Sequence, residues 1–199
     1  MNEHYKMHKE MDGRWIEKKK LHLGSGLKVL KGYTNVDLTN KYGADVIHNL
    51  EKFPYPFKDN TFDYILMDNV LEHLEDTIKV MEELHRISKP NAIINIIVPH
   101  CSGFMAFGSI THKRYFTSGT FNTFEPNNWE KYSKAEFKVL ENKIVWLDCR
   151  NWVWIKPLKK IVNVIINKNK FISERFLSYA LGGFDHIYFR LKVLKWKNK

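Results

Sequence analysis

The chain has 199 residues, of which 44% are hydrophobic and 14% aromatic, and it carries a formal net charge of +10. This composition predicts one ordered domain over residues 1–199 and excludes a disordered or low-complexity protein. No apolar run approaches the ~20 residues that cross a bilayer, and the first residues lack the apolar core of a signal peptide, so we expect a cytoplasmic protein.

The positive charge is concentrated late in the chain. Residues 151–199 contain eleven Lys or Arg against Glu174 and Asp185, which is a net +9 of the total +10. This excess favours contact with a polyanion or an anionic membrane surface, unless the lysines only form a solvated face. Cys101 and Cys149 fit neither a disulfide framework nor a four-ligand zinc site, so we expect free thiols.

Short apolar runs that end at turn residues predict the first strands. They are KKLHLGSG at 19–26, TNVDL at 34–38, ADVIHNL at 44–50 and FDYILMDN at 62–69. The run AIINIIVPH at 92–100 is apolar at nearly every position, which is typical of a central strand buried on both faces. Two late strands are predicted at 141–148 and 186–196, as the antiparallel edge of the same sheet.

A helix is predicted between residues 70 and 88. Apolar residues recur there at three- and four-residue steps, at Leu71, Leu74, Ile78, Met81, Leu84 and Ile87. The sequence KPN at 89–91 then ends the helix. Strands that alternate with helices indicate an α/β fold with a mostly parallel sheet and helices on both faces.

Such sheets bind ligands at the carboxyl ends of their strands. Gly24 and Gly26 allow the backbone to turn and to approach a ligand without an intervening Cβ. Asp37 ends the next predicted strand, where a carboxylate can accept hydrogen bonds from both hydroxyls of a ribose. A nucleoside is therefore the natural ligand. Val29 breaks the dinucleotide pattern G-x-G-x-x-G, and no P-loop sequence is present.

The segments LHLGSG, GYTNVDL, DVIHNLEKFPYPFKDNTFDYILMDNVLEHL and ELHRISKPNAIINIIVPH together resemble the small class I, Rossmann-like S-adenosylmethionine-dependent methyltransferases of the type 11 kind. The resemblance covers about residues 19–100 and implies a seven-stranded Rossmann-like sheet with S-adenosylmethionine as the methyl donor. It also implies cofactor contacts at Gly24, Ser25 and Gly26 for the methionine part, Asp37 for the ribose, Asn49 and Leu50 for the adenine, and Asp68 beside the methyl-transfer site.

Three positions depart from the family pattern. Ser25 stands where many relatives have a small or sulfur-containing residue, and this change is harmless because the backbone makes the contact. Asn49 stands where Asp is more frequent, so the adenine contact loses its charge assistance and the affinity could be lower. Asn91 stands where the family usually turns on Gly, and Asn tolerates the left-handed conformation better than most residues.

The bound sulfonium is already an activated methyl donor, so positioning alone can supply roughly 7 to 11 kcal/mol of the barrier. A general base is needed only for a hydroxyl or a protonated amine. Of His73, His100 and His112, we expect His100, at the end of the 92–100 strand, or His112 to be that base. No metal is expected, because Asn69 replaces the first carboxylate of the Glu-x-x-Glu-His cluster that some class I relatives use.

The acceptor side is expected to consist of residues 1–18, as an N-terminal extension or lid, and of insertions at 101–135 and 150–185. If helical after Pro157, residues 152–176 would be amphipathic and basic, which is typical of a helix on an anionic membrane. The same lysines could follow a phosphate backbone, and the apolar side chains could instead pack in the core.

Two functions remain open from the sequence. The first is an enzyme that methylates a small molecule, or a surface-glycan or lipid-linked precursor, with peripheral membrane contact. The second is a basic module that retains the fold and binds nucleic acid or a protein partner, or a methyltransferase that acts on nucleic acid.

Overall fold

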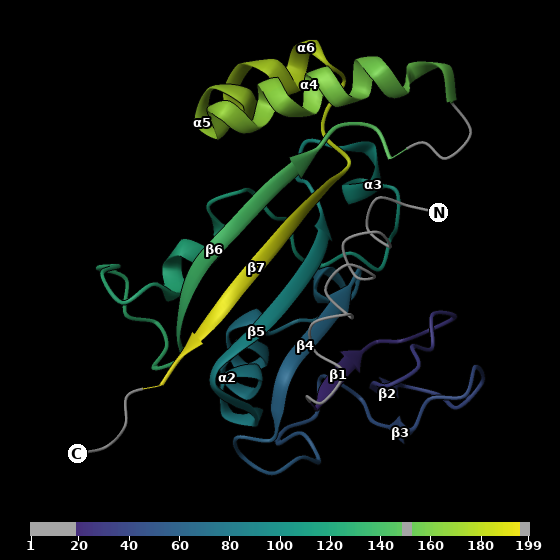
Figure 1. Ribbon diagram of the computed structural model, residues 1–199, viewed down its shortest axis with the longest axis vertical. Coiled ribbons are helices and arrows are strands. Elements are labelled where there is room, and N and C mark those ends of the chain that lie inside the picture. The colour runs from purple at the N-terminus through teal and green to yellow at the C-terminus, as the bar shows by residue number, and fades with distance from the viewer. Residues whose placement is uncertain (1–18, 149–152, 196–199) are drawn as a thin grey trace.

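The computed structural model describes residues 19–148 and 153–195. Within them, seven strands form one sheet in the order β3-β2-β1-β4-β5-β7-β6 (Figure 1). The strands are β1 (Lys20–Leu23), β2 (Thr34–Asp37), β3 (Val46–Ile47), β4 (Phe62–Asp68), β5 (Ser88–Pro99), β6 (Glu136–Val145) and β7 (His186–Leu194). β1 to β5 pair in parallel, and β7 runs antiparallel to β5 and β6. The predicted Rossmann-like sheet with an antiparallel edge is confirmed.

The helical elements of the described residues are mostly short. They are η1 (Leu71–His73), α2 (Thr77–Ile87), α3 (Phe104–Phe107), η2 (Thr120–Phe124), η3 (Val153–Ile155), α4 (Lys156–Lys168), α5 (Lys170–Ile172), η4 (Ser173–Leu177) and α6 (Ser178–Ala180). None of them has the length and apolar composition needed to cross a bilayer. Cys101 is a free thiol, and Cys149 lies outside the described residues.

The helix predicted from residue 70 begins as an α-helix only at Thr77. Asn69, at the end of β4, has a left-handed φ of 55°, and the chain then makes the 3-10 turn η1. Asp76 starts α2 because its carboxylate accepts a hydrogen bond from the Lys79 amide at 3.0 Å. Ile78 differs from the other apolar residues of the predicted helical face, because it is 38% exposed, whereas Val80 is buried.

The main core lies between α2 and one face of the sheet. The buried side chains of α2 pack there against alternate residues of β1, β4, β5 and β7. These α2 residues are Val80, Met81, Leu84 and Ile87. The opposite face carries a smaller cluster that includes Leu66, Ile97 and Tyr188, against which Leu30 and Tyr33 of the β1–β2 connection pack. Burial on both faces explains why the buried central parts of β4 and β5 are mostly apolar.

The predicted end of the helix is confirmed, because α2 ends at Ile87. The KPN sequence itself lies inside β5, at an irregularity near the start of that strand. Phe62 of β4 pairs with Ser88, but the next pair is Tyr64 with Ile93, so extra residues of β5 bulge between them. Asn91 lies in this bulge with a φ of 64°. The left-handed conformation that we expected Asn91 to adopt in place of glycine is therefore confirmed.

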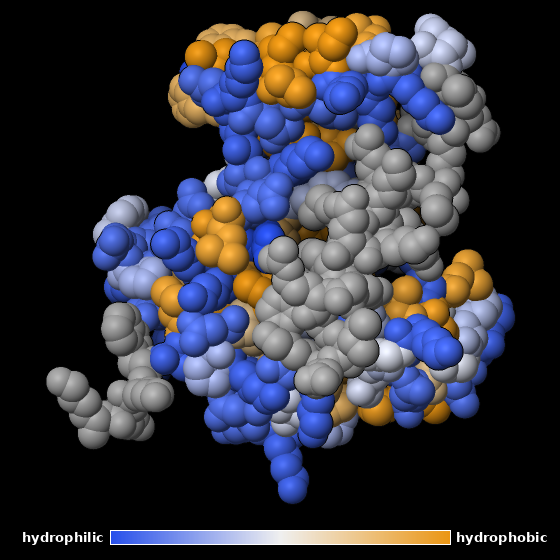
Figure 2. Space-filling model, viewed as in Figure 1, coloured by the Kyte–Doolittle hydropathy of each residue, from blue (hydrophilic) through white to orange (hydrophobic). Residues whose placement is uncertain are grey.

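Residues 156–180 form a helical lobe that stands beyond the end of β6 and the start of β7 (Figure 1). The helix predicted after Pro157 is present as α4. Asn163 and Asn167 attach α4 to β6 and the residue after it, because their side-chain oxygens accept from the amides of Trp146 (2.8 Å) and Ile144 (2.9 Å). Apolar residues also gather on the outer surface of this lobe, as Figure 2 shows.

Candidate functional site

The backbone after β1 turns sharply through Gly24, Ser25 and Gly26. Gly24 has a φ of 66° and Gly26 a φ of 48°, a region that favours glycine. The Ser25 amide donates to the Val36 carbonyl at 3.0 Å, and the Gly26 amide donates to Asp37 Oδ2 at 2.8 Å. The glycine loop and the end of β2 are thus joined by direct hydrogen bonds.

The two glycines have different surroundings. A Cβ added to Gly24 would lie 2.4 Å from Val70 Cγ2, so this position needs glycine for packing against the residue before η1. A Cβ added to Gly26 would meet no atom of residues 19–148 or 153–195 within 4 Å. Gly26 therefore exposes its backbone to open space, which is the property expected of a loop that a ligand approaches closely.

The ends of β2 and β3 carry the groups predicted to hold a nucleoside. Asp37 Oδ1 accepts from the Thr39 amide at 3.3 Å, and Oδ2 accepts from Gly26, which leaves unused lone pairs on both oxygens. Asn49 lies two residues after the end of β3, and its side-chain oxygen accepts from the Glu51 amide at 2.9 Å. Leu50 is buried. Because β3 pairs with β2, Asn49 and Asp37 stand at neighbouring strand ends.

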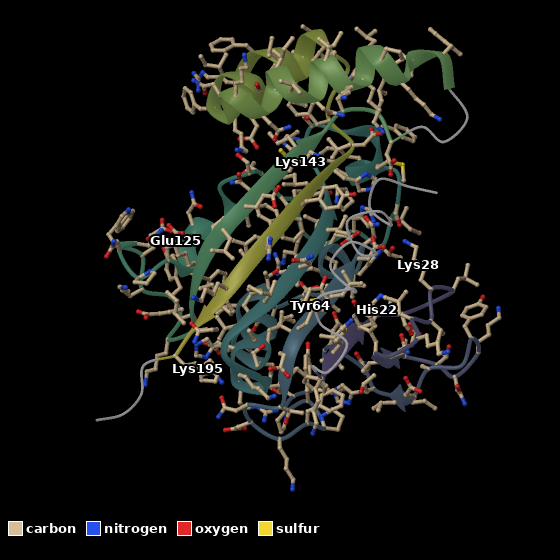
Figure 3. All side chains as sticks on the ribbon, viewed as in Figure 1. His22, Lys28, Tyr64, Glu125, Lys143 and Lys195 are labelled. Atoms are coloured by element: carbon tan, nitrogen blue, oxygen red, sulfur yellow. The ribbon has the colours of Figure 1, made fainter. Side chains whose placement is uncertain are left out.

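Asp68 ends β4, on the other side of β1. Its Oδ2 lies 2.6 Å from the ammonium of Lys28, and its Oδ1 accepts from the side-chain Nδ2 of Asn69 at 2.8 Å. Lys28 comes from the loop after β1 (Figure 3). We did not predict Lys28 from the sequence. Its place two residues after Gly26 was the available signal, since a side chain in that loop can reach the neighbouring strand end.

Glu72 is a buried carboxyl group beside the end of β4. The residue is 1% exposed, and within the described part of the chain neither carboxyl oxygen has a hydrogen-bond partner in another residue. Burial, with a smaller contribution from the nearby Asp68 carboxylate, raises the pKa of Glu72 to about 8. His73 and His112 lie next to it with their rings 4.7 Å apart, and one ligand atom from each of the three residues lies within 4.8 Å of the others.

The segment after β5 brings His112 to this cluster. The Glu72 carbonyl accepts from the amides of Lys113 (2.8 Å) and Arg114 (3.2 Å), so the segment lies against η1. His112 Nδ1 donates to the Ala106 carbonyl at 2.9 Å, which leaves Nε2 as the ring nitrogen that can accept a proton. Burial and the neighbouring His112 lower the pKa of His73. Sequence reasoning missed Glu72 because nothing local reveals its burial.

His100 follows β5 but does not belong to this cluster. Its ring is 1% exposed. Nδ1 accepts from the Ser102 amide at 3.0 Å, and Nε2 lies 3.1 Å from the Glu174 carboxylate in the helical lobe. The ring is thus turned into the protein, where it connects the carboxyl end of β5 to the lobe. Ser118 also holds this carboxylate, through its amide (2.6 Å) and its hydroxyl (3.0 Å).

Comparisons with known proteins concern the domain and the fold. The family described as "Methyltransferase domain" matches residues 31–96. An uncharacterized protein of Methanocaldococcus jannaschii is 35% identical over 78 residues, which are 39% of this chain and 31% of that protein. The match therefore spans about a third of the length of this curated relative.

Two solved structures share the fold over nearly the whole chain. The YcgJ protein of Bacillus subtilis is similar with a TM-score of 0.60 and 14% identity, over 97% of this chain and 100% of that one. An S-adenosylmethionine-dependent methyltransferase of Archaeoglobus fulgidus gives a TM-score of 0.55 and 16% identity, over 94% and 93%. Residues 31–96 thus match the methyltransferase domain family, for which S-adenosylmethionine is the methyl donor, and the strand order of the chain is that of the Rossmann-like methyltransferase fold.

Proposed function

We propose that this protein transfers a methyl group from S-adenosylmethionine to a small molecule or to a surface-glycan or lipid-linked precursor. The observation that carries the proposal is the placement of the glycine loop, Asp37 and Asp68 at the neighbouring ends of β1, β2 and β4. The exposed backbone at Gly26 supports it further, because a bulky cofactor can approach there. A protein that retained the fold without binding the cofactor would have no requirement for the glycine loop, Asp37 and Asp68 at neighbouring strand ends.

The proposed contacts follow the strand ends. The backbone of Gly24, Ser25 and Gly26 would hold the methionine part, and Asp37 would accept from the ribose hydroxyls with its remaining lone pairs. Asn49 and Leu50 would flank the adenine. Asn49 Oδ1 already accepts one hydrogen bond, from Glu51, and its second lone pair is left for the adenine amino group. Asp68 would border the reacting methyl group.

When bound, the cofactor supplies an activated methyl group, and the chain has to orient the acceptor and exclude water. For a hydroxyl acceptor we propose His112 as the general base, because its Nε2 is the nitrogen left to take a proton. His100 remains the second candidate. Both of its ring nitrogens are bonded within the protein, so an acceptor would reach it only after Ser102 or Glu174 had moved.

We also propose that turnover needs no metal. Asn69 provides no carboxylate at the position where metal-using relatives have one. Glu72, His73 and His112 are the group of described residues that a metal would use if this proposal fails.

The acceptor side is proposed to include residues 101–135 and 150–185, with residues 1–18 as an extension or lid. Residues 1–18 and 149–152 lie outside the described part of the chain. Asp68, Asn69 and Val70 stand at the end of β4, where amino-methylating nucleic-acid enzymes carry an Asn-Pro-Pro-Tyr-like signature, and this favours acceptors other than nucleic acid. The basic helical lobe is proposed to contact an anionic membrane.

Binding of the cofactor is the direct test. Titration calorimetry and thermal unfolding should both detect S-adenosylmethionine and its demethylated product. A ligand at 100 times its dissociation constant stabilises the native state by about 2.7 kcal/mol, which raises the Tm of a chain of this size by roughly 5 to 11 °C. No heat and no shift at millimolar ligand would end the methyltransferase proposal. A screen of small hydroxyl, amine and lipid-linked acceptors would then define the substrate.

A further inference from the structure

The outer face of the helical lobe is apolar. Its exposed side chains lie on α4 and on the continuous segment from α5 to α6, and each is between 47% and 85% exposed. They are Leu158, Ile161, Val164, Ile165, Phe171, Ile172, Phe176 and Tyr179. We call this set the apolar face, and Figure 2 shows apolar residues gathered over this part of the molecule. Water-soluble monomers rarely expose contiguous apolar patches beyond a few hundred Å², so the apolar face calls for a partner.

Packing of the lobe onto the sheet does not require these side chains. α4 contacts the sheet with another side, on which Ile166 is buried and Val162 is partly buried against Ile144 and Trp146. Ile161 and Ile165 precede those inward residues by one position and point away from them, at 58% and 50% exposed. The helix α4 is therefore apolar on two sides. One side packs in the core against β6, and the other is exposed.

The lobe that carries the apolar face is also rich in basic residues. The lobe contains Lys156, Lys159, Lys160, Lys168, Lys170 and Arg175, against Glu174 as its one acidic residue. Glu174 is occupied by His100 and Ser118 and faces the sheet. Among the described residues, Lys159 is the lysine of the lobe that forms an ion pair, with Asp148 at 3.9 Å. Arg175 lies over the Phe176 ring, and the other four lysines of the lobe form no ion pair within residues 19–148 and 153–195, so they can interact with an external anion.

We propose that the apolar face is a docking surface for an anionic membrane, with its side chains among the acyl chains and the surrounding cations at the lipid phosphates. A second copy of the chain fits less well, because two faces with an excess of positive charge would repel each other. A nucleic acid could use the lysines, but its phosphate backbone offers no place for eight exposed apolar side chains.

The site lies on the same side of the molecule. Glu174 joins the lobe to His100, at the carboxyl end of β5, and the candidate cofactor groups stand at the carboxyl ends of β1, β2 and β4. A docked lobe would bring this edge of the sheet toward the lipid headgroups. If the proposed methyl transfer holds, this placement favours a lipid-linked acceptor over a freely diffusing one. The docking itself can be tested without turnover.

The test is flotation of the full-length protein with phosphatidylcholine vesicles, with and without phosphatidylglycerol. We expect binding to the anionic vesicles that weakens with salt but persists at high salt through the apolar contacts. Ile161→Ser with Ile165→Ser should weaken binding at least tenfold in every salt condition. Lys160→Gln with Lys168→Gln should weaken it about 25-fold at low salt, roughly fivefold for each lysine, and only on anionic vesicles.

Matched controls remove similar groups elsewhere. Trp129→Ser deletes an aromatic side chain that is 85% exposed, and Lys58→Gln with Lys134→Gln deletes two exposed lysines; both variants should bind vesicles like the wild type. Phe171→Ser with Phe176→Ser provides a second apolar variant if the first fails to fold. Affinity for S-adenosylmethionine should stay unchanged in all of them, which separates membrane docking from the methyltransferase proposal.

Three results would overturn the inference. One is the absence of binding to either kind of vesicle at low salt. Another is wild-type binding by both apolar variants. The third is evidence that something else binds the apolar face. Such evidence would be a concentration-dependent dimer that Ile161→Ser converts to monomer. It would also be RNA binding whose affinity falls log-linearly with salt and is unchanged in the apolar variants.

Discussion

Single alanine substitutions at Gly24 and Gly26 should separate packing from cofactor binding in the loop after β1. At Gly24 an alanine must adopt a φ of 66° and place its Cβ 2.4 Å from Val70 Cγ2. The left-handed conformation costs about 1 to 2 kcal/mol and the overpacking about 1 to 3 kcal/mol. At Gly26 only the conformational cost applies, because the added Cβ meets open space.

Thermal unfolding of the cofactor-free protein measures this difference. At roughly 2 to 4 °C per kcal/mol for a chain of this size, Gly24→Ala should lower the Tm by about 4 to 20 °C and Gly26→Ala by about 2 to 8 °C. Titration calorimetry should show the opposite ranking for cofactor affinity, with the larger loss in Gly26→Ala. This variant should bind S-adenosylmethionine at least tenfold more weakly than the wild type, because the added methyl group occupies the space that the cofactor needs.

Gly32 supplies the control for these two positions. It also has a positive φ, of 82°, and open space around it, but it precedes β2 and lies away from the carboxyl ends of the strands. Gly32→Ala should therefore cost stability without changing the affinity. The reasoning would be refuted if Gly26→Ala bound the cofactor like the wild type, or if Gly32→Ala lost as much affinity as Gly26→Ala.

Four further predictions concern the site and its support. Asp37→Ala should weaken S-adenosylmethionine binding at least tenfold, because each lost hydrogen bond to the carboxylate is worth roughly 1.5 to 3 kcal/mol. Asn49→Asp should preserve or tighten the binding. If calorimetry found the affinity of Asp37→Ala unchanged, the ribose would be held elsewhere. Once an acceptor is known, exhaustive chelation with EDTA should leave turnover intact, and a loss restored by magnesium or zinc would contradict metal independence. With a hydroxyl acceptor, His112→Ala should reduce turnover 10²-fold or more at unchanged cofactor affinity. A variant as active as the wild type would exclude His112 as the base. Burial disfavours the charged form of Glu174, but the hydrogen bonds from His100 and Ser118 outweigh burial and hold the pKa of this carboxyl below its usual range. The stability that wild type gains over Glu174→Gln should thus be present near neutral pH and lost as the pH falls through that pKa, and melting curves that stay parallel from about pH 7 to pH 3 would contradict this.

Local patterns were sufficient to predict most of the sheet. Each parallel strand is an apolar run that ends at a polar or turn residue, so Gly24, Asp37 and Asp68 were found together with their strand ends. The start of α2 was misjudged for a local reason as well. Leu71 and Leu74 are three residues apart, which suits a 3-10 turn as well as the first turn of an α-helix.

Contacts between distant residues could not be predicted in this way. Lys28 and Asp68 are separated by 40 positions, and His100 and Glu174 by 74, so only the folded chain brings these charges together. The position of His100 at a strand end was correct, yet the direction of its ring depends on the lobe. Similarly, the sequence left open whether the apolar side chains of 152–176 are buried. The structure buries Ile166 and exposes Ile161.

The strand order also constrains how the protein is assembled during synthesis. β7 lies between β5 and β6, although residues 100–185 separate β5 from β7 along the chain. Until residues 186–194 emerge from the ribosome, β5 presents an unpaired apolar edge, and β6 lacks the strand that it pairs with in the described sheet. Nascent chains paused before this point would therefore expose two unpaired strand edges and the apolar face of the lobe together, and we expect chaperones to bind them during translation.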